Sequence, residues 1–170
     1  MAEVGMSLGS NLGERLAHLQ EARERLRRVD PGARLLAQSP VYETEPVGVR
    51  PEHAALRYLN AVLVFESELP AGEWLHAIHG LERDMGRVRG ADRNAPRPID
   101  VDILYCGDAC LESNMLIVPH PRWAQRRFVV QPLADVRPDL VLPEAAQSVR
   151  AILAALADPP AGIRLFAREW

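Results

Sequence analysis

Residues 58–66 place the strongest constraint on the fold, because their pattern fits a β-strand and not a helix. Apolar and β-branched side chains alternate there with a period of two, which places them on the two opposite faces of a strand. One face carries Leu59, Ala61, Leu63 and Phe65, and the other carries Tyr58, Asn60, Val62 and Val64. The fold must therefore contain a sheet that gives this strand neighbours.

The remaining periodic segments predict how that sheet is covered. Further strands are expected at residues 4–8, 35–44 and 99–105. Apolar residues at helical spacing predict two long helices, one after Gly9 and one after Pro70. Hairpin-linked strands with two helices between them favour an α+β fold, an antiparallel sheet of the split-βαβ kind, over a doubly wound parallel sheet.

Helix ends and short segments complete this outline. Asn11, with Glu14 three residues later, is expected to be the N-cap of the first helix, and Gly86 to end the second. A loop is predicted over residues 86–98. Short apolar runs follow at residues 115–118 and 128–133, and Ser148 is expected to cap a last helix.

Composition excludes several classes of function. A length of 170 residues with 48% apolar residues predicts one domain over residues 1–170. A net charge of -3 lacks the positive field of non-specific nucleic-acid binding, so no nucleic-acid partner is expected. The absence of lysine excludes a Walker-A loop and Schiff-base catalysis.

Location follows from what the sequence lacks. There is no signal-peptide pattern at the N-terminus and no run approaching 18 apolar residues, so we expect a cytoplasmic protein that makes no membrane contact. Cys106 and Cys110 are too few for a disulfide framework and lack the second half of a zinc site, so both are expected to be reduced thiols.

Asp100 and Asp102 are the most informative candidates for chemistry. On a strand they project from one face about 6.6 Å apart, while Ile99, Val101 and Ile103 point into the core. Two carboxylates so placed would repel unless cations lie between them, as in two-metal sites. A solvated strand face is the alternative interpretation.

The preceding loop carries the complementary charge. Arg87, Arg89, Arg93 and Arg97 lie within eleven residues, and guanidinium groups bind phosphate oxygens bidentately. Arginines beside an acidic pair suggest a magnesium-nucleotide site. An ordinary solvated loop of an arginine-rich chain is the alternative.

Two other segments offer polar side chains for a ligand. His120 lies between Pro119 and Pro121, which fix its direction, and it could bind a phosphate or be a packed surface histidine. Asn60 could bind the edge of a heterocycle on which Phe128 stacks, or be a satisfied structural amide.

In their order and spacing, these segments resemble the 6-hydroxymethyl-7,8-dihydropterin pyrophosphokinase family over residues 7–143. The fold implied by the resemblance is a ferredoxin-like antiparallel sheet with helices on its faces, an αβα sandwich. The matching stretches are Leu8-Gly9-Ser10-Asn11-Leu12-Gly13, Tyr42-Glu43-Thr44-Glu45-Pro46-Val47-Gly48, Tyr58-Leu59-Asn60-Ala61, Gly86-Arg87-Val88-Arg89, Pro96-Arg97, Asp100-Val101-Asp102-Ile103-Leu104 and Val118-Pro119-His120-Pro121.

The resemblance implies transfer of the terminal diphosphate of ATP to the hydroxymethyl oxygen of 6-hydroxymethyl-7,8-dihydropterin, with release of AMP, in folate biosynthesis. It implies catalytic roles for Arg87, Arg97, Asp100 and Asp102, and two Mg²⁺ ions held by Asp100 and Asp102. The ATP-binding positions it implies are His79, Glu82, Arg89, Arg93, Arg97, Ile103, His120 and Arg126. Those for the pterin are Thr44, Val47, Tyr58, Asn60, Asp100 and Phe128.

The sequence departs from the family pattern at three positions and leaves other functions open. Asn94 replaces a tryptophan, His79 a glutamine and Glu45 a proline. We expect a monomer. The competing hypotheses are a two-metal phosphohydrolase or ordinary kinase, an RNA-recognition module, and an effector-binding regulatory domain.

Overall fold

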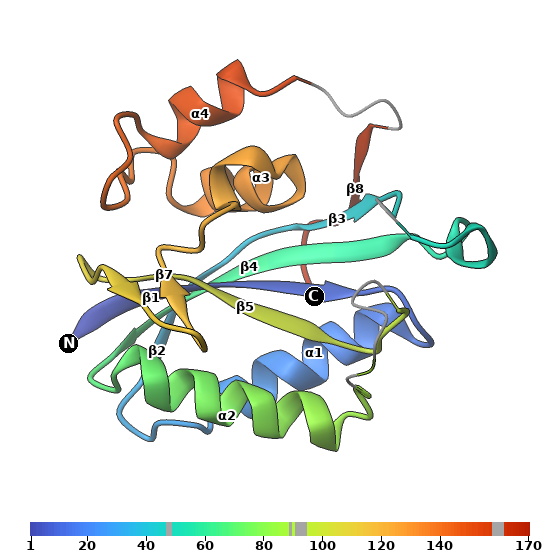
Figure 1. Cartoon of the computed structure of the whole chain (residues 1–170), viewed down its shortest axis with the longest axis horizontal. Helices are drawn as coiled ribbons and strands as arrows, with labels where there is room; N and C mark the ends of the chain where they lie inside the picture. The colour runs from blue at the N-terminus through green and yellow to red at the C-terminus, as the bar shows by residue number, and fades with distance from the viewer. Residues whose placement is uncertain (47–48, 89, 91–94, 158–161) are drawn as a thin grey trace.

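A six-stranded antiparallel sheet forms the middle layer of the protein, and helices cover both of its faces (Figure 1). The structure is a computed structural model that describes residues 1–46, 49–88, 90, 95–157 and 162–170. Strand order is β5-β1-β4-β3-β8, and β2 also pairs with β4. The α+β class and the αβα sandwich predicted from the sequence are confirmed.

Strand β1 lies between the two strands that carry the predicted residues Asn60 and Asp100. β1 (Ala2–Ser10) pairs with β4 (Tyr58–Ser67) on one side and with β5 (Asp100–Cys106) on the other, both antiparallel. The predicted strands at residues 4–8, 58–66 and 99–105 are therefore confirmed within one or two residues.

Two apolar cores hold the helices against the two faces. α1 (Arg15–Leu26) and α2 (Ala71–Asp84) cover one face. There the ring centres of Trp74 in α2 and Phe65 in β4 lie 5.6 Å apart, with the two rings tilted. α3 (Arg127–Val136) and the short α4 (Val149–Ala155) cover the opposite face, over Val62 and Val64. The alternation along β4 thus sends its apolar side chains into both cores.

The segment predicted as one strand over residues 35–44 is two strands, β2 (Arg34–Gln38) and β3 (Val41–Thr44), that pair with successive halves of β4. Pro40 has no N–H to donate, so it interrupts the ladder. Ser39 maintains the pairing there, because its N–H donates to the Val62 carbonyl and its Oγ accepts from the Val62 N–H, at 2.9 and 2.8 Å.

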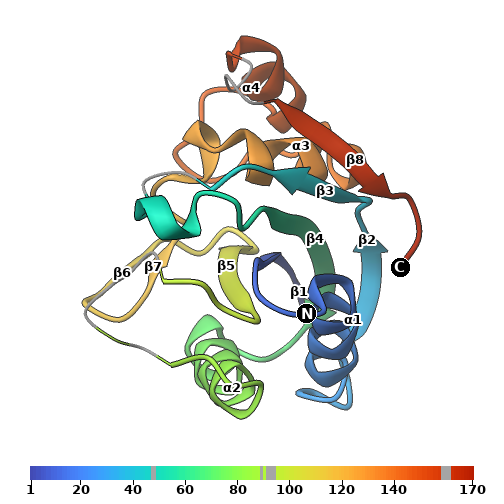
Figure 2. The same ribbon diagram turned by 90° about the vertical axis from the view of Figure 1, so that its right-hand side faces the viewer.

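Strand β8 (Ile163–Ala167) was not predicted, and it extends the sheet beyond β3 (Figure 2). Between β5 and α3, the chain forms a small hairpin of β6 (Leu111–Glu112) and β7 (Ile117–Val118). Two 3-10 turns lie at Pro51–His53 and Trp123–Gln125.

Two sequence-based expectations were wrong in detail. The run at residues 128–133 belongs to helix α3, in which Val129, Val130, Pro132 and Leu133 are buried, whereas the sequence indicated only a short apolar segment. The N-cap of α1 is Glu14 and not Asn11, whose side chain instead accepts a hydrogen bond from the main chain of Arg97.

Ser148 does occupy the N-cap of α4, as expected, although its side chain makes no capping hydrogen bond. Cys106 and Cys110 are free thiols, as expected.

The central strand depends on a glycine that lies under an aromatic ring. A Cβ built on Gly5 would lie 2.1 Å from the Tyr105 ring, which is buried. We predict that Gly5→Ala lowers the free energy of unfolding by about 1–3 kcal/mol, because overpacking forces the ring or the strand to move. Urea denaturation measures the change.

Gly72→Ala is the matched control, because nothing lies within 4 Å of a Cβ at that helical position. It should leave stability equal or slightly higher. A Gly5→Ala protein as stable as the Gly72→Ala protein would contradict the prediction.

Candidate active site

The strand register brings the predicted residues of two separate segments into one row. Gly9 of β1 is the cross-strand partner of Asp100 on β5 and of Asn60 on β4. Partners across a ladder point to the same face, and adjacent strands are about 4.8 Å apart. Because Gly9 has no side chain, a gap opens on this face between the Asp100 carboxylate and the Asn60 amide.

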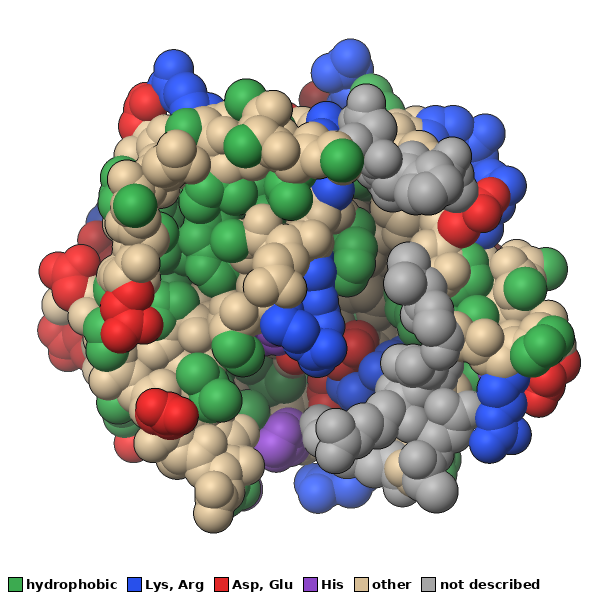
Figure 3. Space-filling model, turned by 45° about the horizontal axis from the view of Figure 1, so that its top comes forward, with side chains coloured by type: hydrophobic (Ala, Val, Ile, Leu, Met, Phe, Trp, Pro, Cys, Tyr) green, Lys and Arg blue, Asp and Glu red, His purple; other side chains and the backbone are tan. Residues whose placement is uncertain are grey.

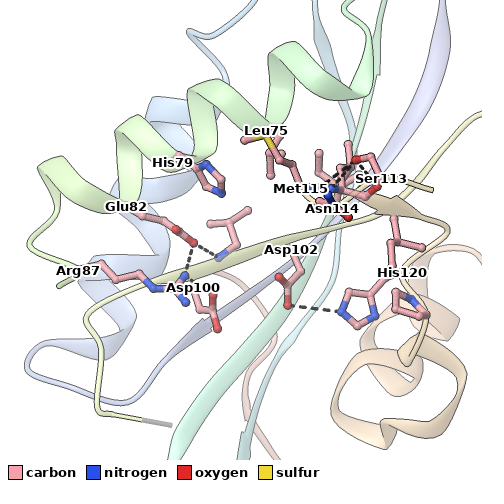
Figure 4. A pocket seen from close by; sticks show the side chains of 15 residues that line it. Leu75, His79, Glu82, Arg87, Asp100, Asp102, Ser113, Asn114, Met115 and His120 are labelled. Carbon is pink, nitrogen blue, oxygen red and sulfur yellow. Dashed lines mark hydrogen bonds and ion pairs between the residues drawn. The ribbon is translucent and has the colours of Figure 1, made fainter. Parts of the chain in front are cut away.

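A pocket of about 310 Å³ lies beside this row, between α2, β5 and the β6–β7 hairpin (Figure 4). Figure 3 shows acidic side chains in a hollow with basic ones next to them. The pocket is in the lower part of the size range of small-molecule sites. Its predicted lining residues are His79, Glu82, Arg87, Asp100, Asp102, Ile103 and His120.

Arg87 links the buried end of α2 to strand β5. Its Nη1 donates to both Glu82 and Asp100. Glu82 is 2% exposed, and its Oε1 also accepts from the Val101 N–H at 2.9 Å. The two carboxylates outweigh the desolvation of Arg87 and raise the pKa of its guanidinium. Glu82 thus supports both Arg87 and the acidic strand, and its contact with ATP stays a prediction.

Arg97 approaches the same carboxylate from the loop side. Its Nη1 lies 3.0 Å from Asp100 Oδ2 and its Nε donates to the Ala95 carbonyl at 3.1 Å. Asp100 is therefore held between two guanidinium groups, one from each end of the predicted arginine loop. The charge complementarity expected from the sequence is present in the structure.

Asn11 is a functional candidate that sequence reasoning assigned incorrectly. Its side chain is buried, its Oδ1 accepts from the Arg97 N–H at 2.8 Å, and its own N–H donates to the Arg97 carbonyl at 3.2 Å. These bonds fix the main chain three residues before Asp100. A polar residue directly after a strand was the available signal, but the same signal fits a helix N-cap.

Asp102 is the less compensated carboxylate of the pair. Its side chain is 46% exposed, and His120 Nε2 lies 4.0 Å from its Oδ2. Desolvation of the carboxylate among the surrounding protein groups and the charge of Asp100 raise the pKa of Asp102 to about 6.

His120 presents a fixed nitrogen to this carboxylate (Figure 4). The Arg122 N–H donates to His120 Nδ1 at 3.1 Å, so Nε2 carries the proton in the neutral ring. Burial and the charges of Arg126 and Arg122 lower the pKa of His120 to about 4. At neutral pH this side chain is therefore an uncharged donor directed into the pocket.

A second group of predicted residues lies beyond Gly9 on β4 and β3. Asn60 Nδ2 donates to Thr44 Oγ1 at 2.8 Å, which orients the amide. Tyr58 is partly buried, and its pKa is raised by burial and also responds to Arg97, Asp100 and Arg87. A Cβ built on Gly9 would lie 3.7 Å from Tyr58 Cδ1, so the ring of Tyr58 borders the gap above Gly9.

Phe128, the predicted stacking residue, lies in the first turn of α3. Arg126 Cζ lies 5.7 Å from the centre of its ring, a cation–π contact. Three predicted residues, Val47, Arg89 and Arg93, lie outside the described residues, as does Asn94. The pocket also has lining residues that were not predicted as site residues, and these are Leu75, Val101, Ser113, Asn114, Met115, Leu116, Ile117 and Pro121.

The surface of the sheet does not favour nucleic-acid recognition. Phe65 and Tyr105, which an RNA-recognition module would need to expose for base stacking, are 0% and 2% exposed. Among the described residues, no helix is long and apolar enough to cross a membrane.

Comparison with known proteins agrees with this geometry. The family model described as 7,8-dihydro-6-hydroxymethylpterin-pyrophosphokinase (HPPK) matches residues 5–138. The chain is 39% identical over 141 residues to the 2-amino-4-hydroxy-6-hydroxymethyldihydropteridine pyrophosphokinase of Pseudomonas aeruginosa, covering 83% of this chain and 84% of that protein. The protein of the same name from Porphyromonas gingivalis is 44% identical, covering 81% of this chain and 92% of that one.

Other relatives are much longer than this chain. The folic acid synthesis protein fol1 of Schizosaccharomyces pombe is 36% identical over 95% of this chain, which spans 21% of that protein. Among solved structures, HPPK-DHPS of Plasmodium falciparum with pteroate has a TM-score of 0.71 and 14% identity, covering 90% of this chain and 42% of that one. That likeness supports the ferredoxin-like fold.

The raised pKa of Asp102 predicts how cation binding depends on pH. Below about pH 6 the carboxylate is protonated and must lose its proton before it binds a cation, so affinity falls as pH drops. Above that pH the carboxylate is charged and affinity levels off. Titration of Mg²⁺ by calorimetry between pH 5 and 8, with a non-hydrolysable ATP analogue present, measures this. Equal affinity at pH 5 and pH 7.5 would be inconsistent with Asp102 as a ligand.

Proposed function

The chain belongs to the 7,8-dihydro-6-hydroxymethylpterin-pyrophosphokinase family, and from that membership we propose that it transfers diphosphate from ATP to the hydroxymethyl group of 6-hydroxymethyl-7,8-dihydropterin, releasing AMP, in folate biosynthesis. The observation that carries this proposal is the family match over residues 5–138, which spans the acidic pair and both arginines that hold it. A monomeric, cytoplasmic, single-domain protein over residues 1–170 stays our prediction.

The acidic pair fits Mg²⁺ in the presence of a nucleotide. Asp100 and Asp102 share one face, and burial together with the charge of Asp100 raises the pKa of Asp102; a bound cation would favour the charged form of both groups. Among the described residues, no group of three or more His, Cys, Asp or Glu could hold a metal alone. Mg²⁺ in nucleotide sites commonly has one or two carboxylates, with phosphate and water oxygens as its other ligands. We assign two Mg²⁺ ions to Asp100 and Asp102; when bound, they would neutralise the phosphates.

The side chains of the protein perform the positioning that this chemistry needs. Phosphoryl transfer depends on alignment and neutralisation more than on a strong base. Arg87 and Arg97 are fixed beside Asp100, from where they can reach phosphate oxygens. His120 donates from Nε2 without adding charge, because Arg122 occupies its Nδ1. We expect His79, Glu82, Ile103, Arg126 and, in the loop, Arg89 and Arg93 to complete the ATP site.

We propose that the pterin lies in the gap above Gly9. The oriented Asn60 amide and Thr44 hydroxyl would bind the polar edge of the heterocycle, and we expect Tyr58 and Phe128 to lie on its two faces. The hydroxymethyl group would then face Asp100, which is the cross-strand partner of Gly9 on β5. Val47 is proposed as a further pterin contact. An alcohol held there would attack the β-phosphorus as AMP leaves.

Product analysis tests the reaction. Phosphorus NMR of the protein with MgATP and the hydroxymethyl pterin should show AMP and the pterin diphosphate. Asp102→Ala should lower the rate by two or three orders of magnitude, about the cost of losing charge stabilisation in the transition state, while the fold survives. Asp108→Ala, on an exposed turn after β5, is the matched control and should retain full activity. ADP or free phosphate as the product would overturn the assignment in favour of an ordinary kinase or a phosphohydrolase.

Gly9→Ala tests the location of the pterin. A Cβ at Gly9 would lie 3.6 Å from Asn60 Oδ1 and 3.7 Å from Tyr58 Cδ1, ordinary contact distances, so the protein should fold normally. The added methyl group occupies the gap, so pterin affinity should fall about tenfold. MgATP affinity should stay within about twofold. Unchanged pterin binding in calorimetry would show that the ring lies elsewhere.

A further inference from the structure

Glu43 is a buried carboxylate for which the proposed chemistry has no use. It is 7% exposed and lies in β3, directly before Thr44. Side chains alternate along a strand, so Glu43 points to the face opposite Thr44 and away from the proposed pterin. A buried charge is costly unless it is paired, and so its partners indicate what it holds together.

Three arginines from three parts of the chain surround this carboxylate. Arg15 at the start of α1 lies 2.8 Å from Glu43 Oε2, and Arg57, which precedes β4, lies 3.7 Å from Oε1. Arg164 of β8, the cross-strand partner of Glu43, contacts the same oxygen as Arg57. Burial alone would raise the pKa of Glu43, but the hydrogen bonds from Arg15 and Arg164 outweigh it and the pKa is lowered. The group is therefore a charged anchor.

Arg15 extends the link from this carboxylate to the main chain of the neighbouring strand. Its Nη1 donates to the Arg57 carbonyl at 2.8 Å, while its Nη2 binds Glu43. One guanidinium group thus connects residue 43 with the carbonyl of residue 57. The next residues along the chain are Thr44 and Tyr58, which are cross-strand partners.

That pair lies at the end of the ladder between β3 and β4. Among the described residues, no ladder pair between β3 and β4 lies beyond it, and the next link between the two segments is the side-chain pair of Arg57 with Glu45, at 3.2 Å. Thr44 Oγ1 accepts the hydrogen bond that orients the Asn60 amide. A shift of the strand end would therefore change the direction of the amide as well as the position of the Tyr58 ring.

We propose that Glu43, through Arg15 and Arg57, is a positioning residue that holds the Thr44–Tyr58 end of the ladder in register and thereby sets affinity for the pterin. This inference rests on the proposed function, because it takes the pterin to lie against Thr44, Tyr58 and Asn60. The Glu43 group lies on the opposite face of the sheet from these side chains, and so it acts without touching the ligand.

Pterin affinity in Glu43→Gln tests this inference. The substitution keeps the size of the side chain and removes its charge. Calorimetry with the hydroxymethyl pterin and a non-hydrolysable MgATP analogue should show pterin affinity lowered about fivefold to tenfold, with nucleotide affinity within about twofold of wild type. In a Thr44→Ala background the same substitution should have little additional effect, because the amide has already lost its acceptor. Glu66→Gln, which breaks the Arg34–Glu66 pair at the far end of β4, should change neither affinity.

The possible results distinguish a failure of the positioning role from a failure of the proposed function. Pterin affinity equal to wild type in folded Glu43→Gln, or equal losses of pterin and nucleotide affinity, would overturn the positioning role and leave the proposed function intact. Absence of pterin binding by the wild-type protein would overturn the proposed function, and this inference with it. If Glu43→Gln does not fold, as circular dichroism would show, then Arg15→Gln removes the same link at the edge of the cluster. It should lower pterin affinity selectively, and unchanged affinity in that variant would equally overturn the role.

Discussion

The pairing of β1 with both β4 and β5 fixes where the site residues lie relative to one another. β1 brings Asn60, from the middle of the chain, and Asp100, from a strand 40 residues later, to the two sides of Gly9. Because neighbouring strands have a fixed spacing, this register sets the distance between the amide and the carboxylate. The apolar side chains of β1, Val4, Met6 and Leu8, are fully buried in the core under α1 and α2, which holds the strand against that layer.

The charges at the site follow from that framework. Asp100 is held by Arg87 and Arg97, while Asp102 has the neutral His120 near it and a raised pKa. The site thus contains cationic groups that a polyphosphate could share and a carboxylate that gains from a metal cation. The acidic pair and the arginines are complementary in the resting protein, and a magnesium-nucleotide would enter that arrangement with both signs of charge already present.

Much of this was predictable from sequence, because the decisive signals were local. Alternation identified β1, β4 and β5, and the Asp-x-Asp spacing on β5 placed both carboxylates on one face. The partners of Asn11 were not predictable, because its bond to Arg97 depends on a contact between residues 86 positions apart. The same is true of β8 and the Glu43 cluster, which require knowing that the C-terminal segment returns to the edge of β3. Helix α3 was missed because Pro132 and a short apolar run masked its periodicity.

Anomalous diffraction from a crystal grown with Mn²⁺ in place of Mg²⁺ and a non-hydrolysable ATP analogue would show directly where the divalent cations bind. We predict anomalous peaks next to the carboxylates of both Asp100 and Asp102, in contact with the phosphate oxygens of the analogue. Metal peaks elsewhere, with Asp100 bound only by Arg87 and Arg97 and with Asp102 facing only His120, would contradict it.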